Sequence, residues 1–213
     1  MDKKYNKKNL FNNLVFLNFK ICYFLINFSK KLINSKKFKQ NSIKTYRFYN
    51  SIMVDKYEKF YIGTTRFTNE TFKENSDWRK KHKWKGCIYG LNKKMPTTVP
   101  YMALVFVIEM NNDTNSIEGI GVVRNYINLK YNTCIYKSDH NYNRYIYNSA
   151  FRKNIDEIEN KKVIKILELM LFYGSRHYKR GQGITTINWD RFDDKAKFVM
   201  KHFFHSLFDN IQD

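Results

Sequence analysis

Hydrophobic positions from residue 57 onward are spaced as in strands at first and as in helices later. The continuous apolar run YMALVFVIEM (residues 101–110) is typical of a strand that is buried on both faces. A six-residue loop joins this run to IEGIGVVRNY, so the two segments predict a hairpin in which Gly119 and Gly121 allow a bulge or a close backbone approach. Shorter strands, which bring the total to about six, are predicted for YEKFYI (57–62), GCIYG (86–90), TCIYK (133–137) and YNRYIY (142–147).

The last third of the chain predicts two amphipathic helices. In residues 155–173 the apolar side chains follow one broad face, acids stand at the start and Gly174 stands at the end. The second helix begins at Asp190 as the N-cap and repeats apolar residues at steps of three and four. Because the two apolar faces need a surface to cover, we expect an α+β fold: a small, strongly bent mixed β-sheet or barrel covered by two C-terminal helices.

The first 52 residues differ in kind from the rest. Residues 1–50 hold 12 Lys and Arg but one acid, and the apolar run at residues 10–28 is long enough to span a bilayer. Several Asn residues and Lys20 make that run a poor hydrocarbon solute, so a membrane-surface helix, a marginal signal anchor and an accidental upstream translation all fit it. Acids and glycine return after Met53. We therefore expect a basic, apolar extension over residues 1–52 and one globular domain over residues 53–213.

Charge favours a polyanionic partner. The chain has a net charge of +20, and the part after residue 50 is still basic. Excess positive charge raises the local concentration of anions and their association rate, which makes nucleic acid the expected partner. The odd set Cys22, Cys87 and Cys134 has no C-x-x-C spacing, so neither a disulfide framework nor a structural zinc site is expected. We expect an intracellular protein without a cofactor; the host cytoplasm or a virion is the expected location if the protein is viral.

The decapeptide GSRHYKRGQG (174–183) concentrates three of the eight glycines of the chain among basic side chains. Gly174 can end the preceding helix, with basic residues favoured beside the helix carbonyls. Alternatively, the loop can bring backbone amides and charged donors to a phosphate. This second interpretation makes nucleic-acid ligands of Arg176, His177, Lys179 and Arg180.

RGQGI within this loop resembles the acyl-CoA site of the N-acyltransferase superfamily. Arg180 and Gly183 match that family's pattern, whereas Thr185 stands where the family has Gly or Ala. The resemblance implies that a strand precedes the loop and a helix follows it, so that helix amides receive a pyrophosphate. Here a helix is predicted before the loop and an extended segment after it. Acyl-CoA-dependent acyl transfer is therefore only a further alternative.

ALVFVIEMNNDTNSIEGIGVVRN followed by CIYKSDHNYNRYIYNSAFR resembles the hairpin and re-entering strands of PUA-like small barrels, including EVE and YTH modules. The likeness covers residues 57–150 and implies RNA or modified-base binding in a surface cleft. As a whole, the chain also resembles proteins of large AT-rich DNA viruses.

Under the nucleic-acid hypothesis, aromatic side chains should stack on bases beside basic ones. Trp78 and Trp84 lie in DWRKKHKWKG (77–86), which reads as a base-stacking and phosphate-contacting loop. Strand alternation in residues 142–147 places Tyr142 and Arg144 on one face, and these two are further candidates. Either tryptophan can instead belong to the core.

Catalytic residues are not evident. Glu109, Glu118, Asp139 and His140 could form an acidic metal site, but their spacing matches no hydrolytic motif, and the pair His202 and His205 lacks a supporting carboxylate. The sequence thus favours a non-catalytic nucleic-acid-binding domain. The rival from another class is a structural or membrane-associated virion protein that works through residues 1–52.

Overall fold

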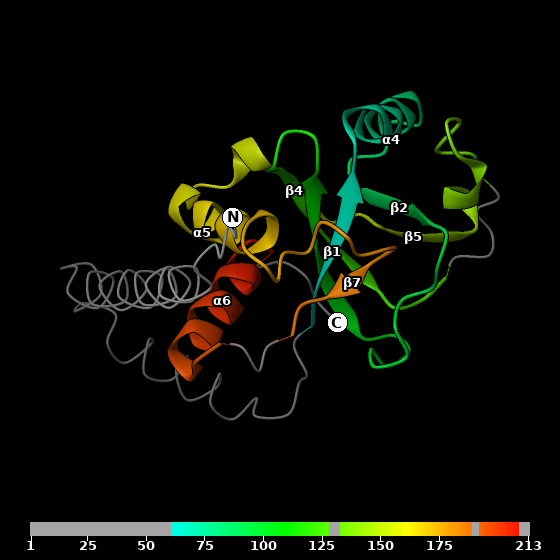
Figure 1. Ribbon diagram of the computed structural model, residues 1–213. Coiled ribbons are helices and arrows are strands. Elements are labelled where there is room, and N and C mark those ends of the chain that lie inside the picture. The colour runs from blue at the N-terminus through cyan, green and yellow to red at the C-terminus, as the bar shows by residue number, and fades with distance from the viewer. Residues whose placement is uncertain (1–60, 128–132, 189–191, 209–213) are drawn as a thin grey trace, which may run out of the picture. The chain divides into compact units, whose positions relative to one another are not determined.

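The computed structural model describes residues 61–127, 133–188 and 192–208 (Figure 1). These residues fall into two compact units: residues 192–203 belong to one, and residues 61–188 with 204–208 belong to the other. The expected extension over residues 1–52 and the expected domain start at Met53 lie outside the described residues. In the part of the chain that is described, no helix has the length and apolar character needed to cross a membrane.

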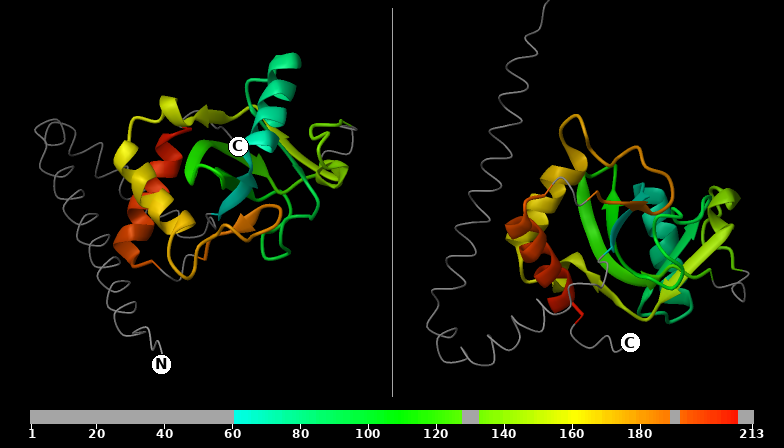
Figure 2. Two further views of the ribbon diagram at one scale, coloured as in Figure 1. Left: turned by 45° about the horizontal axis from the view of Figure 1, so that its top comes forward. Right: turned by 90° about the horizontal axis from the view of Figure 1, so that it is seen from below.

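The described strands form two sheets. A mixed sheet has the strand order β6-β4-β3-β1-β7, with β1 parallel to β3, and β2 pairs with β5 in a separate antiparallel sheet. Their bounds are β1 (Tyr61–Phe67), β2 (Cys87–Leu91), β3 (Leu104–Asn111), β4 (Ser116–Arg124), β5 (Tyr145–Ser149), β6 (Arg152–Asn154) and β7 (Thr185–Thr186). Figure 2 shows that the larger sheet is strongly curved. The α+β prediction is confirmed, and the described strands remain two open sheets rather than a closed barrel.

Strand β3 lies at the centre of the core and is buried on both faces, as its continuous apolar pattern predicts. Val105 and Val107 belong to the cluster that also contains β2 and β5, whereas Phe106 and Ile108 point to the opposite face. The predicted hairpin of β3 and β4 is confirmed, and its register shifts by one residue after Glu109, which is the expected bulge.

Helix α4 (Asn69–Lys81) is a helix that the sequence analysis missed. Thr68 caps this helix. Its hydroxyl accepts a hydrogen bond from the Thr71 amide at 3.2 Å, and the Thr71 hydroxyl accepts one from the Thr68 amide at 2.9 Å. Asn75 and Trp78 are its buried residues, so the helix has almost no apolar stripe from which it could be predicted.

Helix α5 (Lys161–Phe172) confirms the first predicted helix over most of its length. Residues 155–160 precede the helix instead. Ile155–Glu157 form a short 3-10 turn, η2, and the Asn160 side chain caps the helix. At the other end Gly174 has φ +83°, which is the left-handed conformation expected of a glycine that ends a helix. Glu168 of α5 accepts a hydrogen bond from the Ile117 amide of β4 at 3.1 Å and so ties the helix to the larger sheet.

Helix α6 (Asp194–Ser206) confirms the second predicted helix, but its N-cap is Asp193 rather than Asp190, which lies outside the described residues. The Asp193 carboxylate accepts from the Ala196 amide at 2.7 Å. Near its end, the Phe204 ring lies 5.5 Å from the Phe106 ring of β3, measured between centroids.

Three strand predictions need correction. β1 continues past Gly63 to Phe67, residues 133–137 form no strand, and residues 140–143 form a 3-10 turn, η1 (His140–Asn143), before β5 begins. The Asn143 side chain explains the last two differences. Its amide oxygen accepts from the amides of Ile135 and Tyr136, and its amide nitrogen donates to the Tyr136 carbonyl, so a side chain satisfies the groups that a strand partner would bind.

Candidate nucleic-acid interface

The decapeptide 174–183 is a loop between α5 and β7 that folds back on itself. The Tyr178 amide donates to the Leu171 carbonyl at 2.8 Å, and the Gly181 amide donates to the Tyr178 carbonyl at 3.3 Å. Gly183 has φ +68°, and a Cβ atom there would lie 3.3 Å from the Lys93 carbonyl oxygen. The glycines at both ends of the loop are therefore required by backbone conformation.

Lys179 has a structural contact that the sequence did not reveal. Its ammonium group donates to the Asn115 side chain at 2.6 Å, while its carbonyl accepts from Arg66 at 2.5 Å and from Asn112 at 3.1 Å. These bonds fasten the loop to the ends of β1 and β3. Lys179 is thus half-buried and engaged, which corrects its expected position as an open phosphate ligand.

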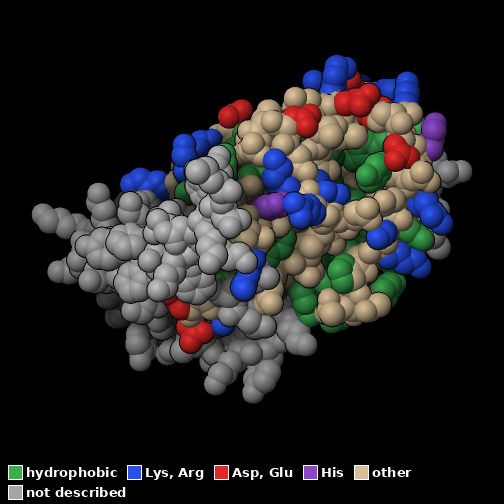
Figure 3. All heavy atoms as spheres, viewed as in Figure 1, with side chains coloured by type: hydrophobic (Ala, Val, Ile, Leu, Met, Phe, Trp, Pro, Cys, Tyr) green, Lys and Arg blue, Asp and Glu red, His purple; other side chains and the backbone are tan. Residues whose placement is uncertain are grey.

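Arg176 and Arg180 are exposed, as a phosphate contact requires. His177 is half-buried, and its Nδ1 accepts a hydrogen bond from the Lys179 amide at 3.2 Å, which stabilises the fold of the loop. Figure 3 shows Lys, Arg and a His side chain gathered at the middle of one face, over the segment between α5 and β7.

A short series of contacts connects this loop to Arg144. Its guanidinium is 5.7 Å from the centre of the Tyr145 ring, and the Lys94 ammonium is 5.6 Å from the same ring. Tyr145 pairs with Leu91, and both Leu91 and Lys93 border Gly183.

We call the exposed cations on these adjoining segments the basic strip: Lys93, Lys94, Arg144, Arg176 and Arg180. They come from the end of β2, the start of β5 and the α5–β7 loop. Within the described ranges, none of the five forms an ion pair or donates a hydrogen bond.

The tryptophans do not form the expected exposed loop, since residues 77–81 are the last residues of α4. Trp78 is only 8% exposed and donates to the Thr133 hydroxyl at 2.8 Å, so it is a core residue. Trp84 packs against the same core and donates to the Cys87 carbonyl at 3.0 Å. The core interpretation holds for Trp78. Trp84 is half-buried, and its ring nitrogen is engaged.

Tyr142 and Arg144 do not share a strand face, because Tyr142 lies in η1 and Arg144 follows that turn. The Tyr142 ring is partly buried and meets Tyr136 edge-on, with the centroids 6.2 Å apart. A Cβ atom on Gly90 would lie 2.4 Å from the Tyr142 carbonyl oxygen, so the turn sits directly on β2. Arg144 therefore joins the basic strip without its predicted neighbour.

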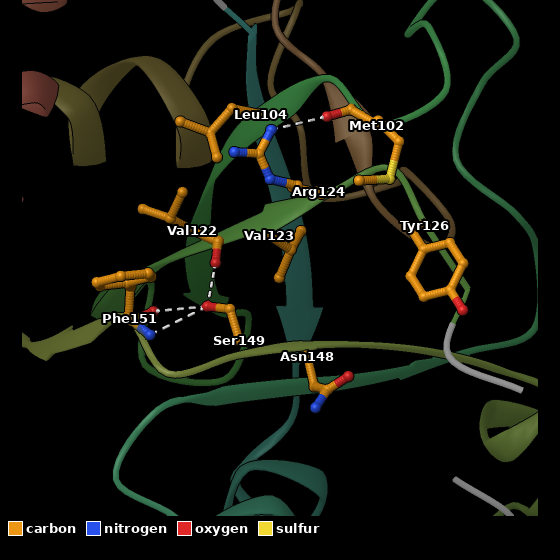
Figure 4. Close-up of a pocket in the computed structure, with 9 residues that line it drawn as sticks. All are labelled: Met102, Leu104, Val122, Val123, Arg124, Tyr126, Asn148, Ser149 and Phe151. Atoms are coloured by element: carbon orange, nitrogen blue, oxygen red, sulfur yellow. Dashed lines mark hydrogen bonds between the residues drawn. The ribbon is translucent and has the colours of Figure 1, made fainter. Parts of the chain in front are cut away.

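A cleft that the sequence analysis missed opens where the two sheets diverge (Figure 4). Its volume is about 250 Å³. We call it the aromatic cleft, and it is lined by Met102, Leu104, Val122, Val123, Arg124, Tyr126, Asn148, Ser149 and Phe151. Figure 4 shows Val123 between Phe151 on one side and Met102 and Tyr126 on the other. The exposed fractions of Tyr126, Met102 and Phe151 are 46%, 43% and 37%.

The former acidic candidates have structural roles. Glu109 is buried and accepts from Tyr89 at 2.9 Å and from Arg152 at 2.9 and 2.6 Å, in a pair whose side chains are 2% and 1% exposed. Burial would lower the pKa of Arg152, but the Glu109 carboxylate raises it above its usual value. Burial, with Glu109 beside it, also raises the pKa of Tyr89 well above the usual range.

The other acidic and histidine candidates do not assemble a site. Glu118 accepts from Asn111 at 2.7 Å, and Asp139 accepts from the Asn141 amide at 2.9 Å in η1. His202 stacks on Phe198, and His205 lies against Phe106. Among the described residues, no group of three or more His, Cys, Asp or Glu side chains could hold a metal ion.

Comparison of the chain with protein-family models, with curated proteins and with solved structures finds no match.

Proposed function

We propose that the protein binds single-stranded nucleic acid, RNA or DNA, through the basic strip and does not catalyse a reaction. The observation that supports this most directly is that five exposed cations stand on three chain segments that adjoin one another at Gly183, Leu91 and Tyr145. Since none of them has an anionic partner in the described part of the chain, an external polyanion is the partner that their charges favour.

Phosphate contacts position a strand without reading its sequence. The cations in the basic strip are separate side chains rather than one preformed pocket, which suits a phosphate backbone better than a single small anion. The Tyr145 ring holds Lys94 and Arg144 near each other through cation–π contacts. We also propose that residues 57–150 belong to a PUA-like domain and that the protein acts inside the cell.

The acyl-CoA alternative gains no support from the geometry around Gly183. The loop is preceded by helix α5 and followed by the two-residue strand β7, so no helix begins directly after the glycines to receive a pyrophosphate. The aromatic cleft, at about 250 Å³, is smaller than the sites of about 300–1,000 Å³ that enclose drug-sized ligands.

The membrane-associated alternative depends on residues 1–52 and stays a prediction. Liposome flotation of the full chain and of a chain without residues 1–50 tests it: loss of flotation on deletion supports a membrane role, and equal flotation of both contradicts it.

Binding to fluorescently labelled single-stranded RNA and DNA tests the proposal, with the full chain and a variant carrying Arg144→Ala, Arg176→Ala and Arg180→Ala. We expect the variant to bind more weakly and by a similar factor for unrelated sequences, because the lost contacts are to phosphate. Lys165→Ala, which removes an exposed charge from α5, is the control and should have the smaller effect. Equal affinity of all three proteins would contradict the proposal.

A further inference from the structure

The aromatic cleft is separate from the basic strip and has no part in the phosphate contacts proposed above. It lies at the Ser149 end of β5, whereas Arg144 and Tyr145 lie at the opposite end of the same strand. Ser149 follows Tyr145 by four residue steps along the strand, which corresponds to roughly 14 Å. One extended polynucleotide strand can therefore reach both places.

The size of the cleft selects a small, flat ligand. A volume of about 250 Å³ falls below the range of about 300–1,000 Å³ that is usual for drug-sized molecules, but it accommodates one heteroaromatic ring system. Tyr126, Phe151 and Met102 supply aromatic and polarizable surface at the rim.

Polar groups also line the cleft, which distinguishes it from a purely apolar groove. Arg124 provides a guanidinium group and Ser149 a hydroxyl, whereas the Asn148 side chain points away from Val123 and Tyr126 (Figure 4). The Arg124 guanidinium is held by the Met102 carbonyl at 3.3 Å, so its position is fixed by the rim itself.

The rim is also held in place before any ligand binds. Met102 has φ +66°, an uncommon conformation for a residue with a side chain, and its amide donates to the Asn125 carbonyl at 3.2 Å. The Asn125 side chain donates to the Val99 carbonyl at 2.8 Å and to the Pro100 carbonyl at 3.3 Å. A strained residue that is fixed by its surroundings is typical of binding sites, since the strain persists only where other bonds impose it.

We propose that the aromatic cleft binds one unstacked nucleobase of the strand whose phosphates lie on the basic strip. The base stacks against Tyr126 or Phe151, and Arg124 contacts its polar edge. The strand part of this inference rests on the proposed function, whereas the affinity of the cleft for a free nucleoside does not. The cleft would thus supply base contacts, which the basic strip does not.

The test uses the full chain and the fluorescent nucleoside 2-aminopurine riboside, which carries no phosphate. We expect saturable quenching of its fluorescence, because a stacked aminopurine is quenched, and competition by adenosine. Tyr126→Ala should weaken binding by about fivefold or more, which is the low end of the loss measured when a base-stacking side chain is removed. Tyr173→Ala removes a ring of 54% exposure at the end of α5 and is the matched control.

The outcomes separate this inference from the proposed function. If Tyr126→Ala weakens the quenching and Tyr173→Ala does not, the result supports base binding in the aromatic cleft, even if no strand binds. Salt-sensitive strand binding without nucleoside quenching, or quenching that both variants or neither variant weakens, would overturn the inference. A thermal melt of each variant excludes unfolding as the cause of weaker quenching. Phe151→Ala is a second change in the cleft and should also weaken the quenching.

Discussion

Replacing Arg152 by Met should destabilise the protein by removing the partner of a buried carboxylate. Glu109 would keep the Tyr89 hydroxyl at 2.9 Å but lose both guanidinium hydrogen bonds, at 2.9 and 2.6 Å. Breaking a buried ion pair from one side costs about 3–5 kcal/mol, because a charge is left without a counterion away from water. Two charge-assisted hydrogen bonds of about 1.5–3 kcal/mol each give the same magnitude. For a domain of this size the loss corresponds to a fall in Tm of about 6–20 °C.

Urea unfolding and a thermal melt of Arg152→Met measure this loss. The double variant Arg152→Met with Glu109→Gln should recover a large part of it, because the buried charge is then gone. Asp77→Asn is the control, since it breaks the exposed pair of Lys73 and Asp77 and should leave the midpoint nearly unchanged. A loss of less than about 1 kcal/mol in the single variant, or a double variant no more stable than the single, would refute the reasoning.

Three further changes test other parts of the structure. Gly121→Ala should destabilise the protein by about 1–3 kcal/mol, because the new Cβ would lie 2.2 Å from the Tyr89 hydroxyl and 2.7 Å from the Cys87 Cβ; an unchanged urea midpoint would contradict this. Burial raises the pKa of Cys87 to about 11, so iodoacetamide at neutral pH should label the exposed Cys134 and spare Cys87, and peptide mapping that finds equal labelling would be the contrary result. Lys179→Ala should lower stability in a urea melt by about 1–3 kcal/mol, because a charged hydrogen bond to the β3–β4 turn is lost; a change confined to nucleic-acid affinity would show that its contact to the turn is unimportant.

The sequence pattern predicted the elements whose periodicity is local and strong. The β3–β4 hairpin and helices α5 and α6 are confirmed, because their apolar residues repeat at the period of the element that forms. Helix α4 has no such stripe, and the pair of Thr68 and Thr71 at its start was the available signal.

Long-range contacts decided the positions that the pattern could not predict. Trp78 packs in the core, where Thr133, 55 residues away, accepts a hydrogen bond from its ring nitrogen. Glu109 pairs with Arg152 at a separation of 43 residues. Arg176 and Arg180 are exposed because their glycine-bounded loop lies at the surface. The aromatic cleft is assembled from the ends of three strands and from the residues beside them, and none of these segments alone shows a binding pattern.

The central claim is that the basic strip holds a phosphate backbone, and its most direct test is the salt dependence of strand binding. For single strands, the slope of log K against log salt is about −0.7 for each phosphate contact. The full chain should show a steep negative slope with single-stranded RNA or DNA, and removing Arg144, Arg176 and Arg180 together should flatten it by up to about 2. Lys165→Ala should leave the slope closer to that of the unchanged protein. A slope that is the same with and without the three arginines would contradict the account, because the strip would then make no contact with phosphate.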